Sequence, residues 1–180
     1  LVIAVWIKCD SKGPVLYKSS RVTAYGKDFK ILKFRTMVVD ADKKGALITV
    51  SGDDRITRVG KKIRRLRIDE FPQLWDIFRG VLSFVGPRPE RPEIAAQYEK
   101  ELPEFSLRLQ AKAGLTGYAQ VYGKYNTTPY DKLQLDLIYM QNYSLLLDIK
   151  LILMTARILF KKESTEGFEE KQKEDISGTK

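Results

Sequence analysis

The sequence predicts an α+β fold in which a β-hairpin near the N-terminus is followed by a small, mostly helical domain. The hairpin is indicated by residues 14–37, where the stretches PVLYKSSRVT and DFKILKFRTM flank the turn sequence AYGK. Gly26 in that turn can adopt the positive φ that tight hairpin turns need. The helical part is indicated by apolar residues that recur at helical spacing from residue 56 onward. A length of 180 residues suits one such domain with a real core.

The composition narrows the classes of function. The chain has 32 Lys and Arg residues against 23 Asp and Glu residues, a formal charge of +9. We therefore expect an anionic partner: a nucleic acid, a phosphorylated small molecule or an anionic membrane surface. The absence of histidine excludes a Ser-His-Asp triad and a His-ligated zinc site. The single cysteine, Cys9, excludes a disulfide within the chain and fits a reducing compartment.

Two helices are expected in the middle of the chain, after a loop over residues 38–54. The first covers residues 56–66, and its other faces are strongly basic. Its apolar side consists of Ile56, Val59, Ile63 and Leu66. The second helix ends at Gly80, a residue typical of helix C-termini. Its buried stripe is predicted to consist of Phe71, Leu74, Trp75 and Phe78.

The rest of the chain is predicted to alternate extended segments and helices. Residues 81–92 are expected to be extended, because their prolines preset φ. The stretch 113–123 is punctuated by glycines and is also expected to be extended. Helices are predicted over residues 91–112, 129–142 and 145–162. The last of these is apolar but contains three charges, which favours a buried or membrane-interface helix over a membrane span.

Asp69 and Glu70 lie just beyond the basic helix. If Asp69 lies at or just before the start of the second helix, Pro72 falls in its first turn, where the missing N–H costs nothing. The ordinary interpretation is then a helix cap, with both acids favoured by the helix dipole. Three features favour chemistry instead: Arg64 five residues upstream, Arg88 between two prolines, and the absence of histidine. A carboxylate can attack a phosphoryl group, and a divalent cation with arginines suits such a reaction.

Several residues have a structural interpretation that competes with a functional one. The basic residues of 55–67 can form a solvated helix face or attract anionic lipid. The aromatic residues expected in the core are Trp75, Phe78 and Phe84. The glycines expected to serve as turn residues are Gly114 and Gly117. Tyr118 and Tyr122 suit either the core or stacking on a nucleotide.

Five blocks of sequence, in this order and spacing, are similar to a known family. They are KFRTM (33–37), RITRVGKKIRRLRIDEFPQLWDIFRG (55–80), SFVGPRPE (83–90), GLTGYAQVYG (114–123) and LDLIYMQNYSLLLDIKLIL (135–153). From about Val15 to Phe160 the chain resembles the bacterial sugar transferases, the monotopic polyprenol-phosphate phosphoglycosyltransferases. The resemblance implies transfer of a phospho-sugar from a nucleoside diphosphate sugar, with uridine the expected nucleoside, to undecaprenyl phosphate. Such a transfer releases a nucleoside monophosphate and initiates polysaccharide or glycoconjugate synthesis.

The resemblance also implies roles for particular residues. Asp69 and Glu70 match the catalytic Asp-Glu dyad of the family. Asp69 is the expected nucleophile, which carries a covalent phospho-sugar intermediate, and both acids are the expected ligands of Mg²⁺. Arg64 and Arg88 match arginines expected to bind substrate phosphate. The candidate substrate-binding residues are Lys124, Gln120 and Asp148.

The sequence departs from the usual family pattern in four places. Val81 stands where an acid is usual, and Ala113 stands where a proline is usual. The hairpin reads RVTAYGK instead of RVGRNGK. The stretch VYGKYN lacks the expected arginine or asparagine-rich patch and leaves Lys124 as a stand-in. These departures bear on substrate contacts more than on the dyad.

The family also has an N-terminal re-entrant membrane helix, of which residues 1 to about 8 could be a remnant. We therefore expect a membrane-associated remnant at 1–13, a catalytic domain at 14–162, and a polar, disordered tail at 163–180.

The resemblance places the protein at the bacterial cytoplasmic membrane, facing the cytosol. Its expected partners are a nucleotide-sugar donor, a polyprenol phosphate acceptor and an anionic membrane surface, without nucleic acid, and a homo-oligomer is left open. Two rival functions also stay open: a catalytically inactive scaffold of the same fold, and a basic module that binds nucleic acid.

Overall fold

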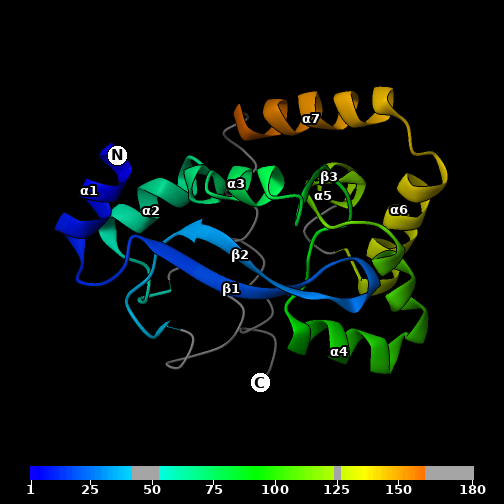
Figure 1. Ribbon diagram of the computed structural model, residues 1–180, viewed down its shortest axis with the longest axis horizontal. Helices are drawn as coiled ribbons and strands as arrows, with labels where there is room; N and C mark the ends of the chain where they lie inside the picture. The colour runs from blue at the N-terminus through cyan, green and yellow to red at the C-terminus, as the bar shows by residue number, and fades with distance from the viewer. Residues whose placement is uncertain (42–52, 124–126, 161–180) are drawn as a thin grey trace, which may run out of the picture. The chain divides into compact units, whose positions relative to one another are not determined.

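The computed structural model describes residues 1–41, 53–123 and 127–160 (Figure 1). These residues form a mixed α+β, mostly helical structure with a β-hairpin near the N-terminus, which confirms the predicted class. Within the described ranges, no helix is both long and apolar enough to cross a membrane. The chain divides into two compact units. The first unit comprises Leu1–Tyr17 and Leu32–Pro72, and the second comprises Lys18–Ile31 and Gln73–Lys161.

The predicted hairpin is confirmed. Strand β1 (Leu16–Val22) pairs with β2 (Asp28–Phe34), and a short 3-10 turn, η1 (Ala24–Gly26), joins them. Gly26 has a φ of +70°, the left-handed conformation expected for it. Tyr25 is left-handed as well, with a φ of +60°, which the sequence did not indicate. The hairpin contributes residues to both units.

The first unit is organised around the contact between α1 (Val2–Asp10) and α2 (Arg58–Arg65). Helix α2 begins after Thr57, whose hydroxyl accepts a hydrogen bond from the backbone N–H of Gly60 at 3.0 Å. The core consists of buried Ile7, Val59 and Ile63, packed against Ile3, Val15, Phe34 and Ile68. The predicted helix is confirmed but is shorter than expected. Ile56 precedes it and forms a bridge with Met37, and Leu66 lies beyond its end and is exposed.

The second unit contains a short parallel sheet and the helices that follow Pro72. Strand β3 (Ser83–Val85) pairs with β4 (Gly114–Thr116). The core consists of buried Val85, Tyr139 and Leu151, packed against Tyr118, Val121, Met140 and Leu147. The helices are α3 (Gln73–Phe78), α4 (Pro92–Glu101), η4 (Pro103–Gln110), α5 (Tyr118–Tyr122), α6 (Pro129–Gln141) and α7 (Leu145–Phe160). Helices α6 and α7 confirm the last two predicted helices.

Two predicted segments differ in detail. The helix expected over 91–112 is interrupted at Leu102, and a separate 3-10 helix begins at Pro103. Proline cannot donate to the preceding turn and disfavours helical backbone before it, so α4 ends there. The stretch 113–123 is extended only in β4, since α5 follows directly.

The interpretation of Gly114 and Gly117 as turn glycines is wrong. A Cβ on Gly114 would lie 2.2 Å from the backbone nitrogen of Gly86, and one on Gly117 would lie 2.1 Å from the Gly86 carbonyl oxygen. Neither glycine has a positive φ. They are needed because two backbone segments approach too closely for any side chain.

The predicted buried stripe on α3 is also wrong. Leu74, Trp75 and Phe78 are 49%, 56% and 79% exposed. Phe71 and Phe84 are more than half exposed as well. The buried residues of α3 are the polar Gln73 and Asp76. Helical spacing shows that apolar residues share a face, but not that this face meets the protein core.

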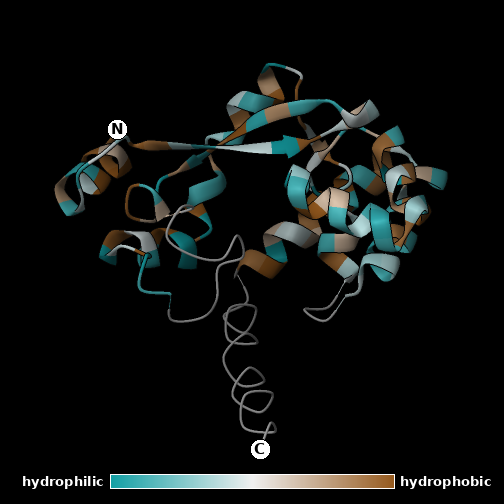
Figure 2. Ribbon diagram, turned by 90° about the horizontal axis from the view of Figure 1, so that it is seen from below, coloured by the Kyte–Doolittle hydropathy of each residue, from teal (hydrophilic) through white to brown (hydrophobic). Residues whose placement is uncertain are grey.

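Figure 2 shows hydrophobic and hydrophilic residues mixed along the described helices, as amphipathic helices require.

Candidate active site

Asp69 and Glu70 lie in η3 (Ile68–Glu70), a single 3-10 turn between α2 and α3. The chain leaves α2 through Arg67, whose φ of 54° is left-handed and strained for a side chain. Helix α3 starts only at Gln73, with Pro72 immediately before it. The placement of Asp69 at or just before the start of this helix, with Pro72 in the first turn, is therefore wrong: Asp69 lies four positions before α3, and Pro72 precedes it. Both acids lie in a turn of their own, so the helix-cap interpretation does not explain them.

Residues at the end of β2 contact this turn and α2. Lys33 Nζ donates to Glu70 Oε1 at 2.7 Å, and about a fifth of each side chain is exposed (20% and 19%). Thr36, just beyond the strand, accepts a hydrogen bond at Oγ1 from Arg64 Nε at 2.8 Å. The motif KFRTM thus fixes one acid of the dyad and the arginine upstream of it.

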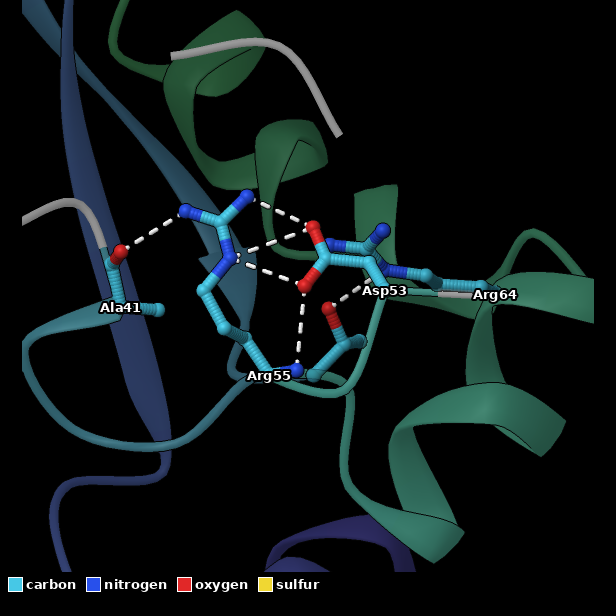
Figure 3. A network of polar contacts seen from close by, with 5 residues as sticks. Ala41, Asp53, Arg55 and Arg64 are labelled. Carbon is cyan, nitrogen blue, oxygen red and sulfur yellow. Dashed lines mark hydrogen bonds and ion pairs between the residues drawn. The ribbon is translucent and has the colours of Figure 1, made fainter. Parts of the chain in front are cut away.

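A second ion pair lies beside Arg64 (Figure 3). Arg55 Nη2 donates to Asp53 Oδ2 at 2.6 Å, and Arg55 Nη1 donates to the carbonyl oxygen of Ala41 at 2.9 Å. Hydrogen bonds from Arg55 outweigh partial burial and lower the pKa of Asp53 to about 2. Burial lowers the pKa of Arg64, whereas Asp69 and Asp53 oppose that change. Arg64 is therefore a part-buried cation that faces two carboxylates.

The electrostatic surroundings of Asp69 suit a nucleophile. Burial raises the pKa of the Asp69 carboxyl, and the charge of Glu70 raises it further. Lys33 and Arg64 act in the opposite direction. A carboxylate with a raised pKa is more basic and hence more nucleophilic, while the two cations help keep it ionised.

Arg88 lies in the second unit, in the loop after β3. Its side chain is exposed, whereas Pro87 and Pro89 on either side are buried. Two buried prolines with fixed φ give the loop a rigid backbone around this arginine. The predicted mount for a phosphate-binding guanidinium is consistent with this geometry.

A family model described as bacterial sugar transferase matches residues 1–162 of the chain. The chain belongs to this family. The resemblance stated from the five sequence blocks is thereby confirmed.

Individual members of the bacterial sugar transferase family are 40% identical to this chain. One is the UDP-N-acetylgalactosamine-undecaprenyl-phosphate N-acetylgalactosaminephosphotransferase of Aeromonas hydrophila, aligned over 162 residues, or 88% of this chain and 38% of the relative. The UDP-glucose:undecaprenyl-phosphate glucose-1-phosphate transferase of Caulobacter vibrioides aligns over 161 residues, 87% and 60% of the two chains. The enzyme of the same name from Xanthomonas campestris pv. campestris aligns over 170 residues, 90% and 35%. The chain thus spans between 35% and 60% of the length of these relatives.

Asp69 and Glu70 are the magnesium ligands predicted from the sequence. The described residues hold no group of three or more His, Cys, Asp or Glu side chains that could bind a metal ion. Asp69 and Glu70 would therefore supply two carboxylates, and substrate phosphates and water would complete the shell. This is the usual way in which Mg²⁺ is bound at sites that handle phosphates.

The other predicted site residues that the structure describes, Arg88, Gln120 and Asp148, lie in the second unit. Asp148, in the first turn of α7, accepts a hydrogen bond from the Tyr139 hydroxyl at 2.8 Å. Gln120 is half-buried, and its amide nitrogen and oxygen form no hydrogen bond within the described part of the chain. Lys124 lies outside the described residues, as do the predicted tail and most of the 38–54 loop. Arg64, Asp69 and Glu70 are brought together in the first unit.

The structure distinguishes the two tyrosines that suited either the core or stacking on a nucleotide. Tyr118 packs against the core of the second unit. Tyr122 is 39% exposed, and its ring lies 4.4 Å from that of Tyr118. The core interpretation is therefore confirmed for Tyr118.

Sequence reasoning missed Lys33 and Thr36. Both lie in the KFRTM block, but their partners are 37 and 28 positions further along the chain. Their place in a block shared with the family was the one available signal.

Proposed function

We propose that this chain catalyses transfer of a sugar phosphate from a UDP-sugar to undecaprenyl phosphate, the step that initiates polysaccharide synthesis. The observation that carries the proposal is the Asp69–Glu70 pair, held in its own turn by Lys33 and faced by Arg64. Membership of the bacterial sugar transferase family and the names of the relatives support the same activity.

The reaction proceeds in two displacements at one phosphorus. In the first, a carboxylate oxygen of Asp69 attacks the phosphorus that carries the sugar, and the bond to the UMP phosphate breaks. UMP leaves with the electron pair, and the sugar phosphate is bound to Asp69 as an acyl phosphate. In the second, an oxygen of undecaprenyl phosphate attacks the same phosphorus and releases the carboxylate. Neither displacement requires proton transfer, so the absence of histidine is no obstacle.

The main barrier is electrostatic, because an anionic carboxylate must approach an anionic diphosphate. Lys33 and Arg64 oppose that repulsion at the dyad. Arg88 is proposed to bind a substrate phosphate through its planar guanidinium, which can donate two parallel hydrogen bonds. Magnesium, when bound at Asp69 and Glu70, would neutralise charge on the phosphates.

We further propose that the chain acts at the cytosolic face of the cytoplasmic membrane, with α7 at the interface. Several apolar residues of α7 are exposed: Leu145, Leu146, Ile149, Ile152, Leu153 and Leu159. The helix also carries Asp148, Lys150 and Arg157, and one charge at a bilayer centre costs about 2.5–3.5 kcal/mol. A position along the interface lets the charges reach headgroups while the leucines contact lipid.

The activity is tested by UMP release from UDP-glucose and UDP-N-acetylgalactosamine, with the full protein, undecaprenyl phosphate and magnesium. Asp69→Asn should reduce release to the level without enzyme with no loss of Tm, because shape is kept and the nucleophile is lost. Arg88→Lys should lose most activity with little change in Tm, because lysine cannot form the bidentate contact. Rapid UMP release by a folded Asp69→Asn protein would refute the proposed mechanism.

A further inference from the structure

Four charged residues form a cluster at the loop that carries Arg88, and all four belong to the second unit. Two of them, Glu90 in the loop itself and Lys132, are partly exposed, with 16% and 25% of their side chains accessible. Arg108 and Asp136 are 2% and 1% exposed. Arg108 donates to Asp136 Oδ2 from both Nε (2.9 Å) and Nη2 (2.6 Å). Lys132 Nζ donates to Glu90 Oε1 at 2.7 Å, and Arg108 Nη1 lies 3.7 Å from the same oxygen.

The cluster contacts the backbone of the Arg88 loop directly. Arg108 Nη2 donates to the carbonyl oxygen of Arg88 at 3.0 Å. Two other loop carbonyls are held by backbone donors: Pro87 O by Gly114 N and Glu90 O by Val22 N, both at 3.0 Å. Arg108 thus holds the backbone of Arg88, which lies between these two backbone hydrogen bonds in the chain.

Arg108 is itself held in one orientation. Its guanidinium carbon lies 4.8 Å from the ring centroid of buried Phe105, and its Nε and Nη2 face Asp136. A planar donor fork restrained on one edge and one face can present its remaining donors in only one direction. That direction is towards the carbonyl of Arg88 and the carboxylate of Glu90.

Stability alone is a weak reason for such a cluster. Desolvation of buried charges offsets most of their attraction, and well-packed hydrophobic replacements of a buried ion pair are often neutral or stabilising. Glu90 of the cluster also interacts electrostatically with Arg88. The contribution specific to Arg108 and Asp136 is the position that they impose on the backbone of the loop.

We propose that Arg108, oriented by Asp136, is a positioning residue that sets the backbone of Arg88 and thereby the placement of the Arg88 guanidinium on substrate phosphate. The inference rests on the proposed function, in which Arg88 binds that phosphate. A displacement of about 1 Å at such a contact can reduce the rate about 100-fold.

The test compares variants so that an effect on the position of Arg88 can be distinguished from an effect on folding. Arg108→Met with Asp136→Leu removes both charges together, so neither buried charge is left unpaired. We expect this double variant to fold with a Tm close to that of the wild type. We also expect it to lose about 10- to 100-fold in kcat/KM for UMP release from UDP-glucose or UDP-N-acetylgalactosamine.

The decisive comparison repeats the double variant in an Arg88→Ala background. If Arg108 acts through Arg88, adding the double variant to Arg88→Ala should lower kcat/KM by less than about 3-fold, because the effects of coupled sites are not additive. Equal losses in both backgrounds, or no loss in the wild-type background, would overturn the positioning role while leaving the proposed function intact. Full activity of Arg88→Ala alone would overturn both the positioning role of Arg108 and the phosphate-binding role of Arg88, but not the transfer activity itself. If the double variant fails to fold, Arg108→Lys carries the same test, since lysine keeps the charge but not the fork.

Discussion

At the scale of single residues, Asp69 is subject to opposing electrostatic influences. Burial and Glu70 raise the pKa of its carboxyl, whereas Lys33 and Arg64 lower it. The raised pKa means that the folded state binds the proton of Asp69 more readily than the unfolded chain does. At a pH above the pKa of Asp69 in the folded state, the ionised carboxylate therefore lowers the free energy of unfolding. This destabilisation disappears as the pH falls below that pKa and the carboxyl becomes protonated. A destabilising acid held among cations is typical of a functional group.

The first prediction concerns this balance. Without magnesium, Glu70→Gln should lower the pKa of Asp69, because it removes a like charge, and Lys33→Met should raise it, because it removes an opposite one. The pKa is measured by NMR titration of ¹³C-labelled aspartate carboxyls. Asp69→Asn serves to assign the signal and should have an equal or higher Tm at pH 7, with the difference shrinking at acid pH. Shifts of the same sign in both variants would contradict the assigned electrostatics.

Two departures from the family pattern meet in the structure. Thr23, in the stretch RVTAYGK, accepts a hydrogen bond at Oγ1 from the backbone N–H of Ala113 at 3.1 Å. Ala113 is 3% exposed, so this N–H has little access to water. The usual proline would have no N–H to donate, and the usual glycine would have no hydroxyl to accept. The two unusual residues therefore form one matched pair.

The second prediction follows from that pair. Thr23→Gly should cost about 1–3 kcal/mol, because it leaves a buried N–H without its acceptor. Adding Ala113→Pro should recover part of this loss, because the orphaned donor is removed. Urea unfolding of both single variants and the double variant measures the coupling. Strictly additive losses would show that the two positions are independent.

At the scale of secondary-structure elements, local patterns predicted some helices and misplaced others. The hairpin, α2, α6 and α7 follow from apolar spacing, turn residues and caps that lie within each segment. The orientation of α3 did not follow, because its exposed aromatic face depends on surroundings outside its sequence. The short strands β3 and β4 exist through pairing with each other, across about 30 positions of chain.

The third prediction concerns the exposed face of α3. Replacing Leu74, Trp75 and Phe78 with serine should change the free energy of unfolding by less than about 0.5 kcal/mol per site, because these side chains are exposed. The same variant should bind vesicles of anionic phospholipid more weakly in co-sedimentation, since aromatic side chains favour the membrane interface. Tyr130→Ser, at another exposed aromatic, is the matched control. Unchanged vesicle binding would exclude α3 from the membrane surface.

At the scale of the whole molecule, the sequence indicated the candidate site residues: the dyad, Arg64, Arg88 and Asp148. It did not indicate the side chains that contact and position them. Lys33, Arg108 and Tyr139 were not predicted, because each acts through a contact between residues on different elements. The family resemblance supplied the reaction, and the structure supplied the restraints on its residues. Together they make the covalent aspartyl intermediate the central proposal, because it explains an acidic dyad among cations in a chain without histidine.

The most direct measurement of that proposal is mass spectrometry of the full protein, quenched with UDP-sugar and magnesium but without undecaprenyl phosphate. Trypsin cleavage after Arg67 and Arg79 gives the peptide IDEFPQLWDIFR, which contains both acids of the dyad. We predict that this peptide gains one sugar phosphate on Asp69, in step with UMP release, and that undecaprenyl phosphate removes it. Active enzyme that never carries the adduct, or an adduct that persists in Asp69→Asn, would contradict the mechanism.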